Sequence, residues 1–105
     1  MTVIESPEDH GLIEVLTLNL CEDMYAFDLV VVFMDVKTKK FYTAADTGCS
    51  CPIPFEQFKT REHLNGPLDW HQVVKLLSKE ASRDWRGDSA EKNLVSAIEK
   101  LMKYR

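Results

Sequence analysis

The chain has few cysteines, prolines and glycines and no long apolar run, and each shortage excludes a class of protein. Its 105 residues include three cysteines, four prolines and four glycines. Three cysteines make no disulfide framework, which agrees with a reducing compartment where thiols stay free or bind a metal. The longest unbroken apolar run, residues 29–34, is far shorter than the ~20 residues that a membrane helix needs. The N-terminus carries Glu5, Glu8 and Asp9 where a secretory signal would be basic, so we expect a cytoplasmic protein without a membrane segment.

Basic residues are missing from the first third of the chain. Residues 1–36 contain eight acids and no Lys or Arg, whereas residues 37–105 contain nine acids and all 13 basic residues, which gives −8 against +4. This asymmetry has two interpretations: an acidic face for a basic partner, or acidic strands that lie beside basic helices and neutralise them. We favour the second, because charge blocks say more about solubility and steering than about a specific partner.

The composition is that of an ordinary globular protein, with 45% hydrophobic and 29% charged residues, and the length leaves room for one domain over residues 1–105. Residues 1–11 show no periodicity, so we expect a mobile arm or a short edge segment there. Three strands are then predicted, at residues 12–20, 27–36 and 41–45. The first alternates, with its leucines (Leu12, Leu16, Leu18 and Leu20) on one parity. The second is apolar on both parities, the pattern of a central strand covered on both faces or packed against a neighbour.

Two helices are predicted to follow. Asp69 is a suitable N-cap with Gln72 as its capping-box partner, and an apolar stripe continues the first helix. That stripe consists of Trp70, Val73, Val74, Leu77 and Ala81. Gly87 suits a stop, Asp88 or Ser89 suits a second N-cap, and the second stripe consists of Leu94, Val95, Ile98, Leu101 and Met102. We therefore predict an α+β fold in which a three-stranded antiparallel meander carries both helices on one face, with Leu29, Val31 and Phe33 beneath them.

The segment Asp-Thr-Gly-Cys-Ser-Cys-Pro at residues 46–52 is the most unusual in the chain. Its first three residues resemble the catalytic loop of retroviral-type aspartic proteases. That chemistry needs two carboxylates sharing a proton and a fold that continues in strands, whereas the rest of this chain is mostly helical in pattern. We favour a turn in which Gly48 takes a positive φ and Asp46 makes an Asx-type hydrogen bond, and we expect no catalytic residue.

Cys49 and Cys51 could hold a zinc ion together with His63, or with His71 or Cys21. The spacing is poor for zinc, since structural sites commonly use two paired knuckles. A nucleophilic cysteine would need a base and a lowered pKa, for which the spacing offers no support. We therefore expect no metal or cofactor and predict a structural loop, formed by Asp46, Gly48, Cys49, Cys51 and Pro52.

One aromatic residue is a candidate binding anchor. Trp85 lies in a predicted loop beside Arg83 and Arg86, and aromatic and Arg side chains are the types most often found as anchors for a protein partner. A weak basic stripe runs along the first helix and this loop: Lys75, Lys79, Arg83 and Arg86. With an isoelectric point near 5.3, nucleic-acid binding is a minority interpretation.

The strand at residues 28–33, the hairpin into residues 41–46 and above all Thr-Gly-Cys-Ser-Cys-Pro at 47–52 with Pro-Phe-Glu at 54–56 resemble a family of small uncharacterised proteins of actinobacterial bacteriophages. The resemblance spans roughly residues 25–86. It implies a protein made in the cytoplasm of an infected bacterium, and small proteins of this kind often bind a host or phage protein. The expected function is therefore a non-enzymatic protein-interaction module of unknown oligomeric state. The alternatives are a small zinc-stabilised structural domain and a nucleic-acid-associated protein.

Overall fold

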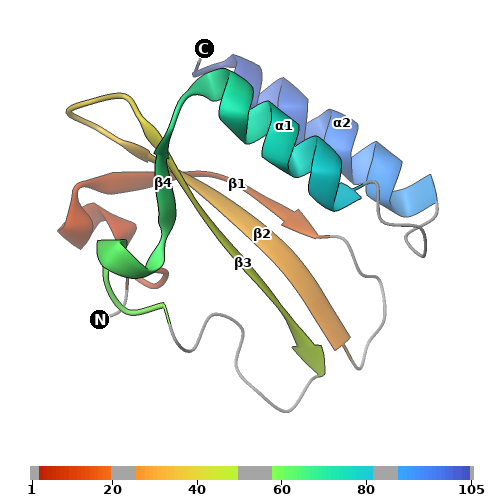
Figure 1. Ribbon diagram of the computed structural model, residues 1–105, viewed down its shortest axis with the longest axis horizontal. Helices are drawn as coiled ribbons and strands as arrows, with labels where there is room; N and C mark the ends of the chain where they lie inside the picture. The colour runs from red at the N-terminus through yellow and green to blue at the C-terminus, as the bar shows by residue number, and fades with distance from the viewer. Residues whose placement is uncertain (1–2, 20–25, 50–57, 82–87, 105) are drawn as a thin grey trace.

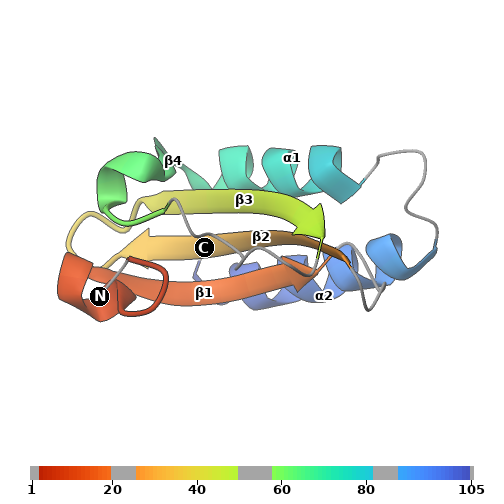
Figure 2. The same cartoon turned by 90° about the horizontal axis from the view of Figure 1, so that it is seen from below.

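The computed structural model describes residues 3–19, 26–49, 58–81 and 88–104. Within these ranges, residues 26–28, 47–49, 81 and 88–92 are described by their backbone course alone. The elements in chain order are a 3-10 helix η1 (Pro7–His10), strands β1 (Leu12–Asn19), β2 (Ala26–Asp35) and β3 (Phe41–Cys49), a 3-10 helix η2 (Arg61–His63), strand β4 (Asn65–Leu68), and helices α1 (Trp70–Ala81) and α2 (Asp88–Met102). The strands form one antiparallel sheet in the order β1-β2-β3-β4. Both helices lie on the same side of this sheet (Figures 1 and 2). The α+β class and the helix placement are confirmed, but the sheet has four strands and not three.

The fourth strand is short and carries the residues least typical of a strand. β4 has the sequence Asn-Gly-Pro-Leu and pairs with β3 through Asn65 with Thr43 and Leu68 with Phe41. Gly and Pro are depleted in strands because one lacks a side chain to pack and the other lacks the N–H donor. β4 tolerates Pro67 because it ends the strand order, where one side of the strand needs no sheet partner. Sequence pattern therefore missed it.

Strand β2 is covered on both faces, which is one of the two arrangements that its two apolar parities left open. Three of its residues, Val30, Val32 and Met34, belong to the core cluster under the helices. The alternate ones, Leu29, Val31 and Phe33, pack in a second cluster on the opposite face. The prediction that placed this second set under the helices is therefore wrong. Both parities are equally apolar, so the sequence of β2 carried no information about which face the helices would take.

A bulge divides β1 between the two faces. Its register with β2 shifts between Glu14 and Leu16, which inserts one extra residue into the strand. Leu12 consequently packs in the cluster on the face opposite the helices, whereas Leu16 and Leu18 pack in the cluster under them. The prediction that these leucines share a face is wrong, because a bulge reverses the side-chain alternation that the prediction assumed.

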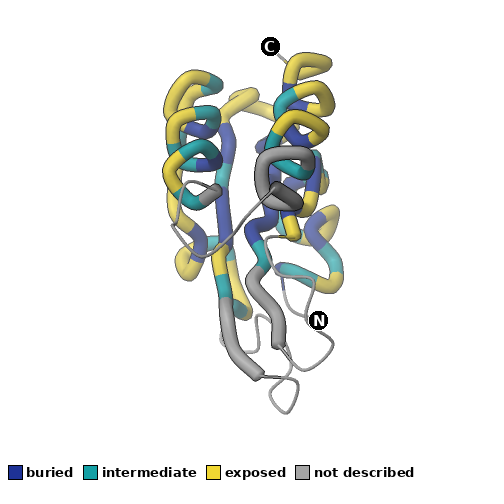
Figure 3. Tube along the Cα trace, turned by 90° about the vertical axis from the view of Figure 1, so that its right-hand side faces the viewer, coloured by how far each residue is buried: buried dark blue, intermediate teal, exposed yellow. Residues whose placement is uncertain are grey.

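Helix α1 begins as the sequence predicted. The carboxylate Oδ1 of Asp69 accepts the Gln72 backbone N–H at 2.8 Å, and Oε1 of Gln72 accepts the Asp69 backbone N–H at 2.9 Å, which completes a capping box. Val73 and Leu77 are fully buried against the sheet. In both helices the described residues that face the sheet are buried, while those on the outward side of each turn are exposed (Figure 3).

The buried face of α2 differs from the predicted stripe. Ala97 and Leu101 are buried, whereas Val95 is 57% exposed and Met102 is 56% exposed. Leu94, Ala97 and Leu101 follow helical spacing as well as the predicted set does, and the cluster under the helices contains them. The prediction overlooked the small Ala97.

The face opposite the helices is covered by two segments without an α-helix or strand of their own, residues 3–10 and 58–64, each of which contains one short 3-10 helix. Val3 is fully buried, its backbone N–H donates to the Lys59 carbonyl at 2.9 Å, and Leu64 is buried in the same cluster. The structure thus places residues 3–11 on the sheet where the sequence predicted a mobile arm or a short edge segment. The apolar residues of this segment, Val3, Ile4 and Pro7, have no regular period, so the prediction gave them no role.

Candidate functional site

Most of the site residues predicted from the sequence lie outside the described residues or are described by their backbone alone. Trp85, Arg83 and Arg86, the predicted partner anchors, lie outside the described residues. Lys75 and Lys79, the other half of the predicted basic stripe, are exposed on α1. Neither the anchor nor the stripe is tested by the structure, and both stay predictions.

The predicted structural loop begins later than expected. Strand β3 continues through Cys49, and Asp46 pairs with Leu29 while Gly48 pairs with Phe27. Asp46, Gly48 and Cys49 therefore lie in a strand, and the turn predicted at Asp46 and Gly48 is wrong. The physical reason is that β2 offers a pairing partner as far as Ala26, and strand pairing overrides a local preference for turns.

Cys51 and Pro52 lie outside the described residues, and of Cys49 only the backbone course is described. The zinc alternative therefore stays untested. His63, its third candidate ligand, serves the local backbone: its Nδ1 accepts the N–H groups of Lys59 at 3.1 Å and Thr60 at 3.2 Å. Among the residues whose side chains are described, no three His, Cys, Asp or Glu side chains gather in a way that could hold a metal ion.

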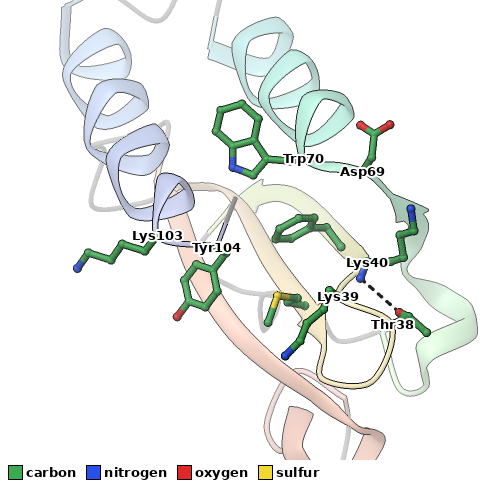
Figure 4. A pocket seen from close by; sticks show the side chains of 9 residues that line it. Thr38, Lys39, Lys40, Asp69, Trp70, Lys103 and Tyr104 are labelled. Carbon is green, nitrogen blue, oxygen red and sulfur yellow. Dashed lines mark hydrogen bonds between the residues drawn. The ribbon is translucent and has the colours of Figure 1, made fainter.

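A hollow of about 610 Å³ lies where the β2–β3 turn meets the start of α1 and the end of α2 (Figure 4). Its floor is apolar: Met34 and Phe41 belong to the core under the helices, and the half-buried Trp70 packs against that core. The indole N–H of Trp70 donates to the Leu101 carbonyl at 3.0 Å, which fixes the ring between the two helices. Tyr104, which is 37% exposed, also lines the hollow.

The rim of this hollow is basic. Lys39, Lys40 and Lys103 line it and are exposed, and in Figure 4 their side chains extend outward on different sides of the hollow. Asp69 is the one acidic residue among the lining residues, and its Oδ1 accepts the backbone N–H of Gln72 in the capping box of α1. Three ammonium groups against one carboxylate leave the hollow locally positive on a chain of net charge −4.

Backbone hydrogen bonds hold two of these lysines in place. Residues 36–40 form the β2–β3 turn, in which Lys39 takes a left-handed φ of 62° and its N–H donates to the Asp35 carbonyl at 2.9 Å. The Lys40 N–H donates to Oγ1 of Thr38 at 3.3 Å (Figure 4). Beyond α2, the Tyr104 N–H donates to the Leu101 carbonyl at 3.0 Å, which extends the helical course to the edge of the hollow.

Asp35 links this turn to the other face of the sheet. Its Oδ1 accepts the backbone N–H of Lys37 at 2.8 Å, and its Oδ2 accepts Nη2 of Arg61 at 2.5 Å. The Lys37 N–H and the Arg61 guanidinium hold the pKa of Asp35 below its usual value of 3.8, and the same carboxylate raises the pKa of Arg61. Arg61 also donates from Nη1 to the His10 carbonyl at 3.1 Å and lies 5.0 Å from the centre of the Tyr42 ring. This ion pair thus joins the acidic first third of the chain to a basic residue of the remainder.

The hollow could not be predicted from the sequence, because its lining comes from three separate segments: residues 34–41, 69–70 and 103–104. The available signal was the basic turn Lys-Thr-Lys-Lys at residues 37–40. An apolar floor with exposed ammonium groups around it can bind a partly apolar anion, since burial of apolar area supplies affinity and the charges select the sign of the ligand.

The comparisons with known proteins give one family. A family model described as a domain of unknown function, DUF7574, matches residues 1–105. The chain belongs to the DUF7574 family. No curated protein and no solved structure shows a significant match to it. Within the described part of this DUF7574 chain, no helix is both long and apolar enough to cross a membrane.

Proposed function

We propose that this DUF7574 chain is a non-enzymatic protein-interaction module. The observation that supports the proposal is the hollow beside the β2–β3 turn, where an apolar floor of Met34, Phe41 and Trp70 opens between exposed lysines. Met34 and Phe41 are themselves almost fully buried, so the apolar surface that stays open between the lysines comes from the half-buried Trp70 and from Tyr104. Open aromatic surface with a polar rim is typical of a site that receives another molecule.

The carboxylate of Asp35, at the start of the β2–β3 turn, has a structural role. Both of its oxygens accept hydrogen bonds, one from two backbone N–H groups and one from Arg61. These hydrogen bonds stabilise the ionised form and lower the pKa of Asp35, which makes the carboxylate a weaker general base. These contacts favour a binding role for this end of the molecule over a catalytic one.

The biological setting belongs to the proposal as well. The resemblance of residues 25–86 to small proteins of actinobacterial bacteriophages supports a phage accessory protein that acts in the bacterial cytoplasm and modulates a host factor or binds a phage protein. The DUF7574 family carries no description of function, so this part of the proposal depends on the cysteine motif at residues 47–52.

The experiment is a search for a stoichiometric partner. The purified chain is incubated with lysate of an actinobacterium, and each retained protein is then produced separately and mixed with the chain at known concentration. We expect a complex that elutes as one species in size-exclusion chromatography and shows a defined Kd by calorimetry. A chain that turns over a substrate, or that forms its stable complex with nucleic acid and with no protein, would contradict the proposal.

The same assay tests the anchor predicted from the sequence. Trp85→Ala is expected to weaken the complex by ~2 kcal/mol or more if Trp85 contacts the partner. Lys59→Glu, on the segment that covers the opposite face of the sheet, is the control and should leave affinity unchanged. An unchanged Kd for Trp85→Ala would remove this loop from the interface and leave the hollow as the contact surface.

A further inference from the structure

We infer that the hollow binds a short acidic segment of a partner protein, with one large apolar side chain of that segment on the floor and its carboxylates beside the lysines. The inference rests on the proposed function and names the chemistry of the partner at that site. Its occupant is a linear stretch of a few residues, rich in Asp and Glu around an aromatic or long aliphatic residue.

Charge decides the sign of the ligand. Lys39, Lys40 and Lys103 reach the rim from two separate parts of the chain, and all three are exposed. The three lysines line the same hollow, so their positive potentials add there. Asp69 is the single carboxylate among the lining residues, so the three ammonium groups still leave an excess of positive charge. Acidic side chains are therefore attracted here and basic ones are repelled.

The acidic residues elsewhere on the chain limit the length of an acidic ligand. The chain carries −4 overall, and Glu5, Glu8, Asp9 and Glu14 are exposed along the N-terminal segment and β1. A nucleic-acid strand is a continuous polyanion and would meet this acidic surface beyond the hollow. A short acidic peptide would use the positive hollow alone, so these observations favour a peptide over a nucleic acid.

The floor decides the apolar part of the ligand. A volume of about 610 Å³ lies within the ~300–1,000 Å³ typical of ligand sites and accepts a large side chain. The half-buried Trp70 and the 37% exposed Tyr104 offer aromatic surface that favours an aromatic or long aliphatic guest. The indole N–H is already bonded to the Leu101 carbonyl, so Trp70 contributes apolar contact and makes no demand for a polar partner.

The test uses a random dodecapeptide library displayed on yeast and the intact purified chain as bait. Enriched peptides are expected to carry an excess of Asp and Glu around one aromatic or aliphatic residue. One enriched peptide is then synthesised, and its binding is followed by amide chemical shifts, which should change at residues 38–41, 70 and 103–104. The double variant Lys39→Glu/Lys103→Glu should raise the Kd of that peptide about tenfold and should itself select basic peptides.

Lys59→Glu is the control, since it makes at one exposed lysine on the opposite face of the sheet the charge reversal that the double variant makes at two, and it should select the acidic peptides of the unaltered chain. Far-ultraviolet circular dichroism confirms that each variant is folded. Tyr104→Ala should weaken the peptide about fivefold with an unchanged unfolding midpoint, because Tyr104 lies beyond the end of α2.

Several outcomes would overturn the inference. They are enriched peptides without an acidic excess, shift changes confined to other residues, tighter binding of an oligonucleotide at the hollow, and salt-dependent self-association in which the acidic segment of a second copy fills it. Failure of the inference is distinguishable from failure of the proposed function. A stoichiometric protein complex that is insensitive to Lys39→Glu/Lys103→Glu retains the interaction module and removes the hollow as its site.

Discussion

Both faces of the sheet are buried, but they are covered in different ways. On one face, two amphipathic helices bury Val73, Leu77 and Leu101 against the strands. On the other face, residues 3–10 and 58–64 bury Val3 and Leu64 with no α-helix or strand of their own, only the short 3-10 helices η1 and η2. The same central strand, β2, supplies apolar side chains to both faces.

The difference lies in what holds each cover in place. A helix satisfies its own backbone and needs only a matching apolar stripe, so α1 and α2 attach mainly by apolar contact. The irregular segments must place their backbone groups individually: Val3 donates to Lys59, and Arg61 binds both the His10 carbonyl and Asp35. The irregular cover therefore depends on single polar contacts and on backbone conformations that only certain residues adopt.

The largest expected effect tests whether the irregularly covered face is a true core. Phe33 is almost fully buried there, and we expect Phe33→Ala to lower the free energy of unfolding by ~3–5 kcal/mol, because it removes a large side chain and leaves a cavity. Leu77→Ala on the helix-covered face should cost ~2–5 kcal/mol. Urea denaturation followed by circular dichroism measures both.

Val95→Ala is the control for this pair, since Val95 is exposed on α2 and its loss should change stability by less than ~0.5 kcal/mol. A loss below ~1 kcal/mol for Phe33→Ala would show that the irregular segments cover the sheet without forming a core. A loss above ~1 kcal/mol for Val95→Ala would instead support the stripe predicted from the sequence.

A smaller effect is expected at two glycines that lie just after the segments of the irregular cover, Gly66 in β4 and Gly11 after η1. Gly66 has a φ of 155°, and a Cβ there would lie 2.7 Å from the Phe41 carbonyl oxygen and 2.7 Å from Cδ1 of Tyr42. We expect Gly66→Ala to cost roughly 1–3 kcal/mol, because β4 would have to move away from β3.

Gly11 is the comparison, with a left-handed φ of 74° but with only the flexible end of Arg61, at 3.6 Å, near its added Cβ. Gly11→Ala should cost about 1 kcal/mol, the penalty of the backbone conformation alone. Thermal unfolding of the two variants side by side gives the ranking. A smaller loss at Gly66 than at Gly11 would mean that the contact between β3 and β4 yields easily.

The smallest expected effect concerns the ion pair that fastens the irregular cover. Folding lowers the pKa of Asp35, so the unfolded chain binds this proton more readily, and the contribution of Asp35 to stability is present above about pH 4 and is lost as the pH falls below 3.8 through the folded value. The contribution is modest because the Arg61 side chain is 35% exposed and water screens the pair.

The measurement compares the unaltered chain with Asp35→Asn, which cannot ionise, by urea denaturation from pH 7 to pH 2. The unaltered chain should be the more stable at neutral pH, and the gap between the two should narrow as the pH falls below 3.8. A gap that stays constant across this range would show that Asp35 acts through shape and not through its charge.

The sequence alone determined the features that depend on neighbours along the chain. Asp69 and Gln72 predicted the start of α1 because a capping box is formed within three residues. The two apolar parities of residues 27–36 predicted a central strand with apolar side chains on both faces, because side chains alternate along any strand. The α+β class followed from the change of period between the first half of the chain and the second.

Tertiary structure decided what depends on residues far apart. It set which parity of β2 faces the helices, inserted the bulge into β1, extended β3 through Cys49 and recruited Asn-Gly-Pro-Leu as β4. It also brought the lysine-rich turn, Trp70 and Tyr104 around one hollow. In each case the chain had local conformations of similar free energy to choose from. Contacts between residues far apart in the sequence decide which conformation forms, and no short stretch of sequence contains those contacts.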